Sequence, residues 1–165
     1  MKRQPMLWLA GLALLAPSFA CAGCLQQNAI YSDRDGAYEL TFEPVDSEAA
    51  SASHRLKVRI SNSDLVLDGY VMPSEPVNRS NGMLFNHCPD GDVTGADIAA
   101  CTVWEGMVYA NIAGKIDLLP AEGADAAPEI LLAGFGAAIV ESSAWGPKKA
   151  TIAPWDVFAL KGCAP

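Results

Sequence analysis

The strictest pattern in the chain is the alternation of apolar and cationic residues in HRLKVRI, residues 54–60. Leu56, Val58 and Ile60 occupy every second position, and an arginine or lysine precedes each of them. Because successive side chains of a strand point to opposite faces, this pattern predicts a strand with one buried and one solvated face. A solvated face is typical of antiparallel sheets, so the segment favours an antiparallel fold.

Further strands are predicted from alternation and from β-branched or aromatic content, at residues 37–42, 65–72, 83–85, 101–112, 115–119 and 154–161. The apolar segment 130–140 contains two glycines, which fits a buried strand or a short helix. Residues 23–37, 73–82 and 86–100 are polar or interrupted by proline and glycine, and we expect loops there. Strands joined by short turns, without helical periodicity, predict a mainly β fold, either an antiparallel β-sandwich or a barrel.

A leader with the three zones of a secretory signal peptide opens the chain. Two basic residues precede an apolar run at residues 6–16, which is too short to cross a bilayer as a helix because that takes about 20 residues. Small residues then lead to a cleavage site after Ala22. This organisation predicts residues 1–22 as a cleaved signal peptide and residues 23–165 as a single exported β-rich domain, periplasmic or extracellular.

The cysteine count favours this cleavage, because it removes Cys21 from a set of five and leaves an even number. An even number of cysteines in an exported protein predicts structural disulfides. We pair Cys88 with Cys101, because they enclose a short loop. The second pair is then Cys24 with Cys163, and the two ends of a domain often lie close together. The predicted fold is therefore stapled by two disulfides.

Two other ways of processing the leader stay open. Cleavage after Ala20 would leave all five cysteines, with one thiol unpaired. Acylation of Cys21, as in bacterial lipoproteins, would leave four cysteines to pair and would anchor the protein to a membrane. We expect contact with a membrane only through the signal peptide or through such a lipid on Cys21.

The acidic composition limits the class of partner. The formal net charge is −8, and cleavage of the leader makes it more negative because two basic residues leave with it. Such a chain repels phosphate backbones, so the sequence argues against nucleic-acid binding. A protein or a small molecule is the expected ligand, and nothing in the sequence identifies it.

One polar stretch, NHCPDGDVTGAD at residues 86–97, resembles the calcium loop of EF-hand and dockerin-like modules. Calcium prefers six or more oxygen ligands around a sharp turn that contains glycine. The resemblance implies calcium as a cofactor and implies five ligand residues: Asn86, Asp90, Asp92, Thr94 and Asp97. Cys88 stands at a position where the calcium loop carries Asp or Asn, so the favoured interpretation is an acidic turn closed by a disulfide, with no cofactor, and calcium is the alternative.

The sequence contains none of the common catalytic motifs: no G-x-S-x-G elbow, no phosphate-binding P-loop and no HExxH. Its histidines are His54, which we expect to be solvated at the start of a strand, and His87. The leading prediction is therefore a small exported, non-enzymatic binding or interaction domain. The alternatives are a domain stabilised by calcium at residues 86–97, and a hydrolase whose site assembles only in the fold.

Overall fold

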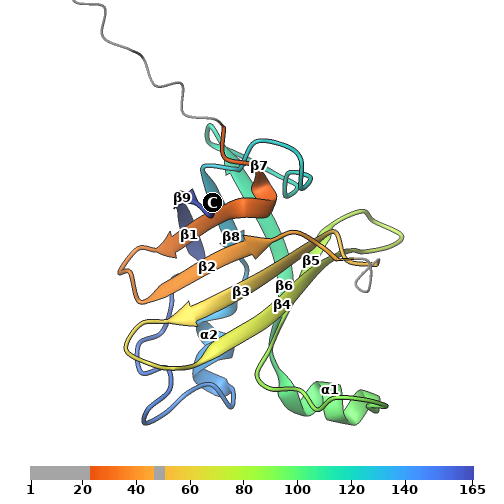
Figure 1. The fold of residues 1–165 in the computed structure, drawn as a ribbon, viewed down its shortest axis with the longest axis vertical. Helices are drawn as coiled ribbons and strands as arrows, with labels where there is room; N and C mark the ends of the chain where they lie inside the picture. Colours follow the sequence, from red (N-terminus) through yellow and green to blue (C-terminus); the bar gives the residue numbers. More distant parts are fainter. Residues whose placement is uncertain (1–22, 47–50) are drawn as a thin grey trace, which may run out of the picture.

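The computed structural model describes residues 23–46 and 51–165, which form a closed antiparallel β-barrel (Figure 1). The strands follow one another around the ring in chain order: β1 (Ala29–Asp33), β2 (Tyr38–Glu43), β3 (His54–Ile60), β4 (Val66–Pro73), β5 (Ser80–Phe85), β6 (Thr102–Ile112), β8 (Glu129–Leu132) and β9 (Val157–Cys163). Strand β9 pairs with β1 and completes the circle. The mainly β, antiparallel prediction is confirmed, and of its two forms the barrel is correct.

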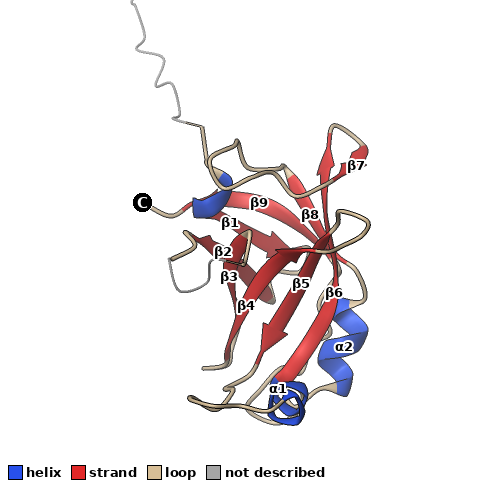
Figure 2. Cartoon of the chain, turned by 90° about the vertical axis from the view of Figure 1, so that its right-hand side faces the viewer, coloured by secondary structure: helices blue, strands red, loops and turns tan. Residues whose placement is uncertain are grey.

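Four further elements lie outside the ring of strands. Strand β7 (Lys115–Asp117) pairs with the end of β6 and makes a projecting hairpin, and a 3-10 helix η1 (Gln26–Asn28) precedes β1. Helices α1 (Gly95–Cys101) and α2 (Phe135–Glu141) lie toward the same end of the barrel (Figure 2). Within residues 23–46 and 51–165, no helix is long and apolar enough to cross a membrane. The predicted leader, with Cys21, lies outside the described residues.

The predicted loops are where sequence and structure differ. Strand β1 lies within residues 23–37, strand β5 begins at Ser80, and α1 occupies the end of the 86–100 segment. Strand β1 is short and flanked by polar turns, so its alternate burial becomes visible only once it pairs between β2 and β9. The apolar segment 130–140 contains both predicted forms, because it begins in β8 and continues into α2.

The barrel interior is filled by side chains. The inward positions alternate with outward ones along each strand, as in β3, where Leu56, Val58 and Ile60 are buried as predicted. The largest fully buried side chains come from almost every strand and from α2: Tyr31, Tyr38, Phe42, Phe135, Phe158, Leu40, Leu56, Leu67, Leu84, Ile130, Leu132 and Ile139. This packing is that of a solid core and not of a container for a ligand.

Phe135 of α2 closes one end of the barrel. Its ring centroid lies 5.9 Å from that of Tyr38, 5.9 Å from that of Trp104 and 6.0 Å from that of Phe158. Trp104 donates a hydrogen bond from Nε1 to the Ala133 carbonyl oxygen at 3.0 Å, which ties β6 to the turn before α2. The aromatic cluster therefore holds helix and barrel together.

The loop at residues 118–127 covers the opposite end (Figure 1). Gln26 is fully buried beneath it and accepts hydrogen bonds at 3.1 Å from the Tyr31 hydroxyl and from the Ala127 backbone N–H. The Ala126 backbone N–H donates to the Cys24 carbonyl oxygen at 2.7 Å. Both ends of the barrel are thus closed by structure from the same chain.

Both predicted disulfides are present, Cys24–Cys163 and Cys88–Cys101. The first joins the segment before η1 to the end of β9, and the second joins the loop after β5 to the end of α1. The first therefore ties the two ends of the described barrel together, while the second fastens a local excursion between β5 and β6.

These two disulfides should differ in what they contribute to stability. The residues joined are 139 positions apart in Cys24–Cys163 and 13 apart in Cys88–Cys101. By loop-closure entropy, replacing the first pair by serine should lower the free energy of unfolding by about 5 kcal/mol and replacing the second by about 3 kcal/mol. Denaturant unfolding of the two double variants measures this, and a smaller loss for Cys24→Ser with Cys163→Ser would contradict the order.

Candidate binding surface

The predicted calcium-loop residues lie on the loop after β5 and at the start of helix α1. Among the described residues, no group of three or more His, Cys, Asp or Glu side chains is placed to hold a metal ion. Asp90 and Asp92 are exposed, and Asn86 donates from Nδ2 to the Ser143 hydroxyl at 3.2 Å. Calcium binding at residues 86–97 stays a prediction.

Thr94 and Asp97 instead cap helix α1. The Asp97 backbone N–H donates to Thr94 Oγ1 at 3.3 Å, and the Asp97 carboxylate accepts from the Thr94 backbone N–H at 2.9 Å and from its hydroxyl at 2.7 Å. This reciprocal pair is a capping box, which satisfies donors at the start of the helix. The same hydrogen bonds lower the pKa of the Asp97 carboxyl group. The pattern that resembles a calcium ligand set therefore has a local structural role.

His54 is buried, which corrects the prediction that it is solvated: its exposed fraction is 3%. Its ring packs edge-on against Phe42, and Nε2 lies 2.7 Å from the Pro120 carbonyl oxygen. Because a carbonyl only accepts, Nε2 carries the proton, and Nδ1 faces the Ser53 hydroxyl at 3.0 Å. Burial lowers the pKa of His54, so the neutral ring is favoured.

His87, the other histidine, is exposed and lies beside Asn86, with Nδ1 2.6 Å from Asn86 Oδ1. Ser53 Oγ, beside His54, also lies 3.1 Å from the Val71 carbonyl oxygen, so this hydroxyl and ring are engaged in holding the barrel wall. The structure gives neither histidine the arrangement of an accessible nucleophile and base. The hydrolase alternative stays a prediction.

The outer face of β2 and β3 is charged and internally paired. Arg55 lies 3.5 Å from Glu43 and 3.1 Å from Asp46, and Lys57 lies 3.0 Å from Glu43. Glu39, on the same face, pairs with Lys161 of β9 at 2.7 Å. This is the solvated face that the alternation of residues 54–60 predicts.

The outer face of β4, β5 and β6 carries several large apolar side chains beside the polar Asp68, Asn81 and Glu105. Its large side chains are partly exposed and occupy outward positions next to buried inward neighbours. We call this set the methionine face: Tyr70, Met72, Met83, Phe85 and Met107. Large apolar side chains grouped on the outside of a filled barrel need a reason beyond folding, because outward positions contribute little to the core.

The strand register places these side chains side by side. Met83 of β5 lies opposite Tyr70 of β4. Asn81, two residues earlier in β5, lies between Met72 of β4 and Met107 of β6, and is directly opposite each. Tyr70 and Met83 are therefore direct neighbours, whereas Met83 and Met107 are diagonal neighbours, because Asn81 and Glu105 occupy the positions opposite them.

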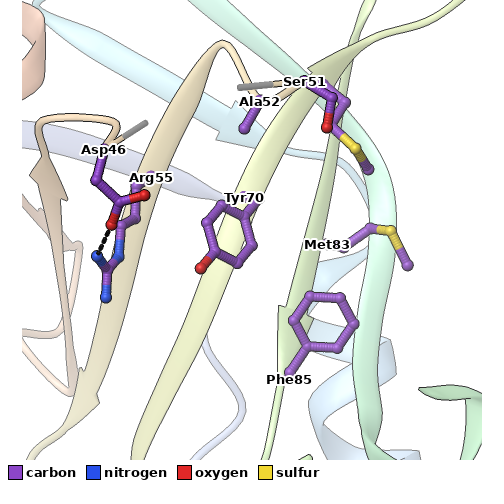
Figure 3. Close-up of a pocket in the computed structure, with 8 residues that line it drawn as sticks. Asp46, Ser51, Ala52, Arg55, Tyr70, Met83 and Phe85 are labelled. Atoms are coloured by element: carbon purple, nitrogen blue, oxygen red, sulfur yellow. Dashed lines mark hydrogen bonds and ion pairs between the residues drawn. The ribbon is translucent and has the colours of Figure 1, made fainter. Parts of the chain in front are cut away.

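An open groove runs along the methionine face. Two adjoining hollows share Arg55, Tyr70 and Phe85. One hollow extends past Met83 toward residues 51–52, and the other extends past His87 toward α1. Figure 3 shows the rings of Tyr70 and Phe85 beside Met83, with Arg55 bonded to Asp46 at the rim. We call this depression the outer groove.

The outer groove has an acidic rim. Asp68 and Asp90 line one hollow, while Asp46, at the other hollow, is paired with Arg55. A groove with an apolar floor and an acidic rim fits a ligand that presents apolar groups beside positive charge.

A separate hollow, which we call the far hollow, lies on the other side of the barrel, against β9. Trp155, an exposed aromatic residue, lines this hollow. The Arg34 guanidinium stacks on its ring, with Cζ 3.7 Å from the ring centroid. Trp155 Nε1 donates to Asp35 at 2.9 Å, and hydrogen bonds from Arg34 and Trp155 lower the pKa of Asp35. Arg34 covers one face of the indole, and the exposed Val157 beside Trp155 adds apolar surface to this hollow.

Comparison with models of protein families, with curated proteins and with solved structures finds no match to this chain. The assignment of a site therefore depends on the geometry of the chain itself. The sequence does carry a signal for the methionine face: in residues 65–72 and 83–85, the positions that alternate with buried residues are themselves apolar at Tyr70, Met72, Met83 and Phe85. Only pairing of β4 with β5 shows that these positions are neighbours.

A substitution in the cap of α1 can show whether Thr94 stabilises the helix or binds calcium. Thr94→Ala should lower the free energy of unfolding by about 1 kcal/mol, because the helix loses a capping hydrogen bond. The loss should be the same with calcium and with EDTA, and the melting temperature of the unaltered protein should not depend on calcium. Thr151→Ala, at an exposed threonine outside the helices, is the control. A calcium-dependent stabilisation that disappears in Thr94→Ala would support the metal loop instead.

Proposed function

We propose that this chain is an exported, non-enzymatic binding module that holds a polypeptide ligand against the outer groove. The observation that carries the proposal is the contrast between a filled, closed barrel and an outer face with large apolar side chains. A ligand has no room inside, so recognition falls to the surface. On that surface, the methionine face groups partly exposed aromatic and methionine side chains.

Methionine and aromatic side chains suit this role for physical reasons. Methionine is flexible and polarisable, so it adapts to ligands of different shape, and tyrosine and phenylalanine add contact area at low entropic cost. Tyr70 and Phe85 border both hollows of the outer groove, which places them centrally. Central aromatic residues commonly carry most of the energy of a protein interface.

Charge supports a cationic partner. The net charge of the chain is −8, and the rim of the outer groove is acidic. Opposite charge on a ligand accelerates the encounter and discourages acidic competitors. The proposed ligand is therefore a polypeptide segment with apolar side chains next to lysine or arginine.

Export is the second part of the proposal. Two disulfides are typical of proteins that fold in an oxidising environment outside the cytosol. Together with the predicted signal peptide at residues 1–22, they support a periplasmic or extracellular location, with a membrane anchor if Cys21 carries a lipid.

A peptide display library selected on the disulfide-bonded protein tests the binding proposal. We expect enrichment of peptides that combine apolar and basic residues, and binding that weakens as salt is raised. Tyr70→Ser with Phe85→Ser should weaken binding of the selected peptides about 10-fold or more, because the central contact area is lost.

Trp155→Ser is the matched control, since it removes an exposed aromatic side chain at the far hollow. It should leave peptide affinity unchanged, and melting temperatures of all variants show that they fold. The proposal is wrong if selected peptides bind the Tyr70 and Phe85 double variant as tightly as the unaltered protein, or if only Trp155→Ser loses them.

A further inference from the structure

All three methionines among the described residues lie on the methionine face. Met72, Met83 and Met107 are partly exposed there. The largest fully buried side chains are instead tyrosine, phenylalanine, leucine and isoleucine. Methionine is an ordinary core residue, so its concentration on one outer face points to a use of its sulfur atom there.

The strand register brings the three thioethers within reach of one point. Met72 and Met107 lie on either side of Asn81, two strand spacings apart, or about 9.6 Å. Met83 lies diagonally from both, at about 7–8 Å. Each methionine side chain has three rotatable bonds, so three sulfur atoms at the corners of such a triangle can turn toward its centre.

Thioether sulfur selects a particular class of metal ion. It is a soft, uncharged ligand that suits Cu(I) and is unsuited to calcium or magnesium, which prefer oxygen. The cysteines Cys24, Cys88, Cys101 and Cys163 are held in disulfides and so do not compete as thiolates. Glu105 lies opposite Met83 and accepts a hydrogen bond from Asn81 Nδ2 at 3.3 Å, between Met83 and Met107. A cation among the three sulfur atoms would therefore lie beside this amide and carboxylate, and the negative charge of Glu105 favours it.

We propose that Met72, Met83 and Met107 bind one soft monovalent metal ion, Cu(I), at the centre of the methionine face. The step is binding alone and involves no change in oxidation state. Ag(I) has the same charge and ligand preference without the redox chemistry, so it is the probe. The inference uses the face of the proposed function but needs no polypeptide partner, so the two proposals can fail separately.

Calorimetric titration of the disulfide-bonded protein with Ag(I), in chloride-free buffer, tests the proposal. We expect one Ag(I) site. Each single Met→Leu variant should lower the Ag(I) affinity by at least about 10-fold, because even the loss of a residue that supports a metal ligand has an effect of this size. The triple variant Met72→Leu, Met83→Leu, Met107→Leu should lose the site. Leucine keeps the volume and apolar character of methionine, so the variants should fold, and melting temperatures check this.

The pH dependence separates thioethers from imidazole. A thioether carries no proton to release, so Ag(I) affinity should be constant between about pH 5 and pH 7, whereas histidine ligation weakens as the ring is protonated. His87→Gln, at the histidine that lines the outer groove, is the control and should bind Ag(I) unchanged. Binding that survives the triple substitution, that weakens at low pH or that is lost in His87→Gln would overturn the inference.

Peptide binding by the triple leucine variant keeps the two proposals apart. Leucine preserves the apolar surface, so peptides selected on the unaltered protein should still bind with affinity within about 10-fold. If the triple variant loses Ag(I) binding but still binds the peptides, both the metal site and the docking proposal are supported. Retention of Ag(I) binding by the triple variant overturns the metal site without affecting the docking proposal.

Discussion

The packing of Phe135 against Tyr38, Trp104 and Phe158 is the constraint on which the rest of the structure depends. A barrel of this size has an interior just wide enough for side chains, so it either fills or holds a small ligand. Here α2 carries an aromatic ring into one end, and the loop at residues 118–127 covers the other. Recognition is thereby moved from the inside of the barrel to its outer wall.

Much of the fold was predictable because period-2 alternation reports one buried face. Residues 54–60 are a strand with the predicted inward positions, and the cysteine spacing predicted both disulfides. Strand β1 and helix α1 were not predicted. The first is stabilised by pairing with two strands distant in sequence, and the second is a short helix whose capping box resembled a metal loop.

The candidate site was harder to predict than the fold for a related reason. The calcium-loop residues and the histidines were the candidates from the sequence, yet Thr94 and Asp97 cap a helix and His54 belongs to the core. The methionine face consists of residues unremarkable one by one, and strand register makes them neighbours. A docking face and a soft-metal site on the same three strands would let one ligand influence the other.

The central claim is that ligands meet the outside of the barrel while its interior stays unchanged. Methyl NMR of the protein, titrated with a peptide selected on it, tests this most directly. The account predicts shifts of the methyl signals of Met72, Met83 and Met107, with those of the interior residues Leu40 and Leu67 unmoved. Shifts confined to the interior methyl groups, with the methionine signals unchanged, would contradict it.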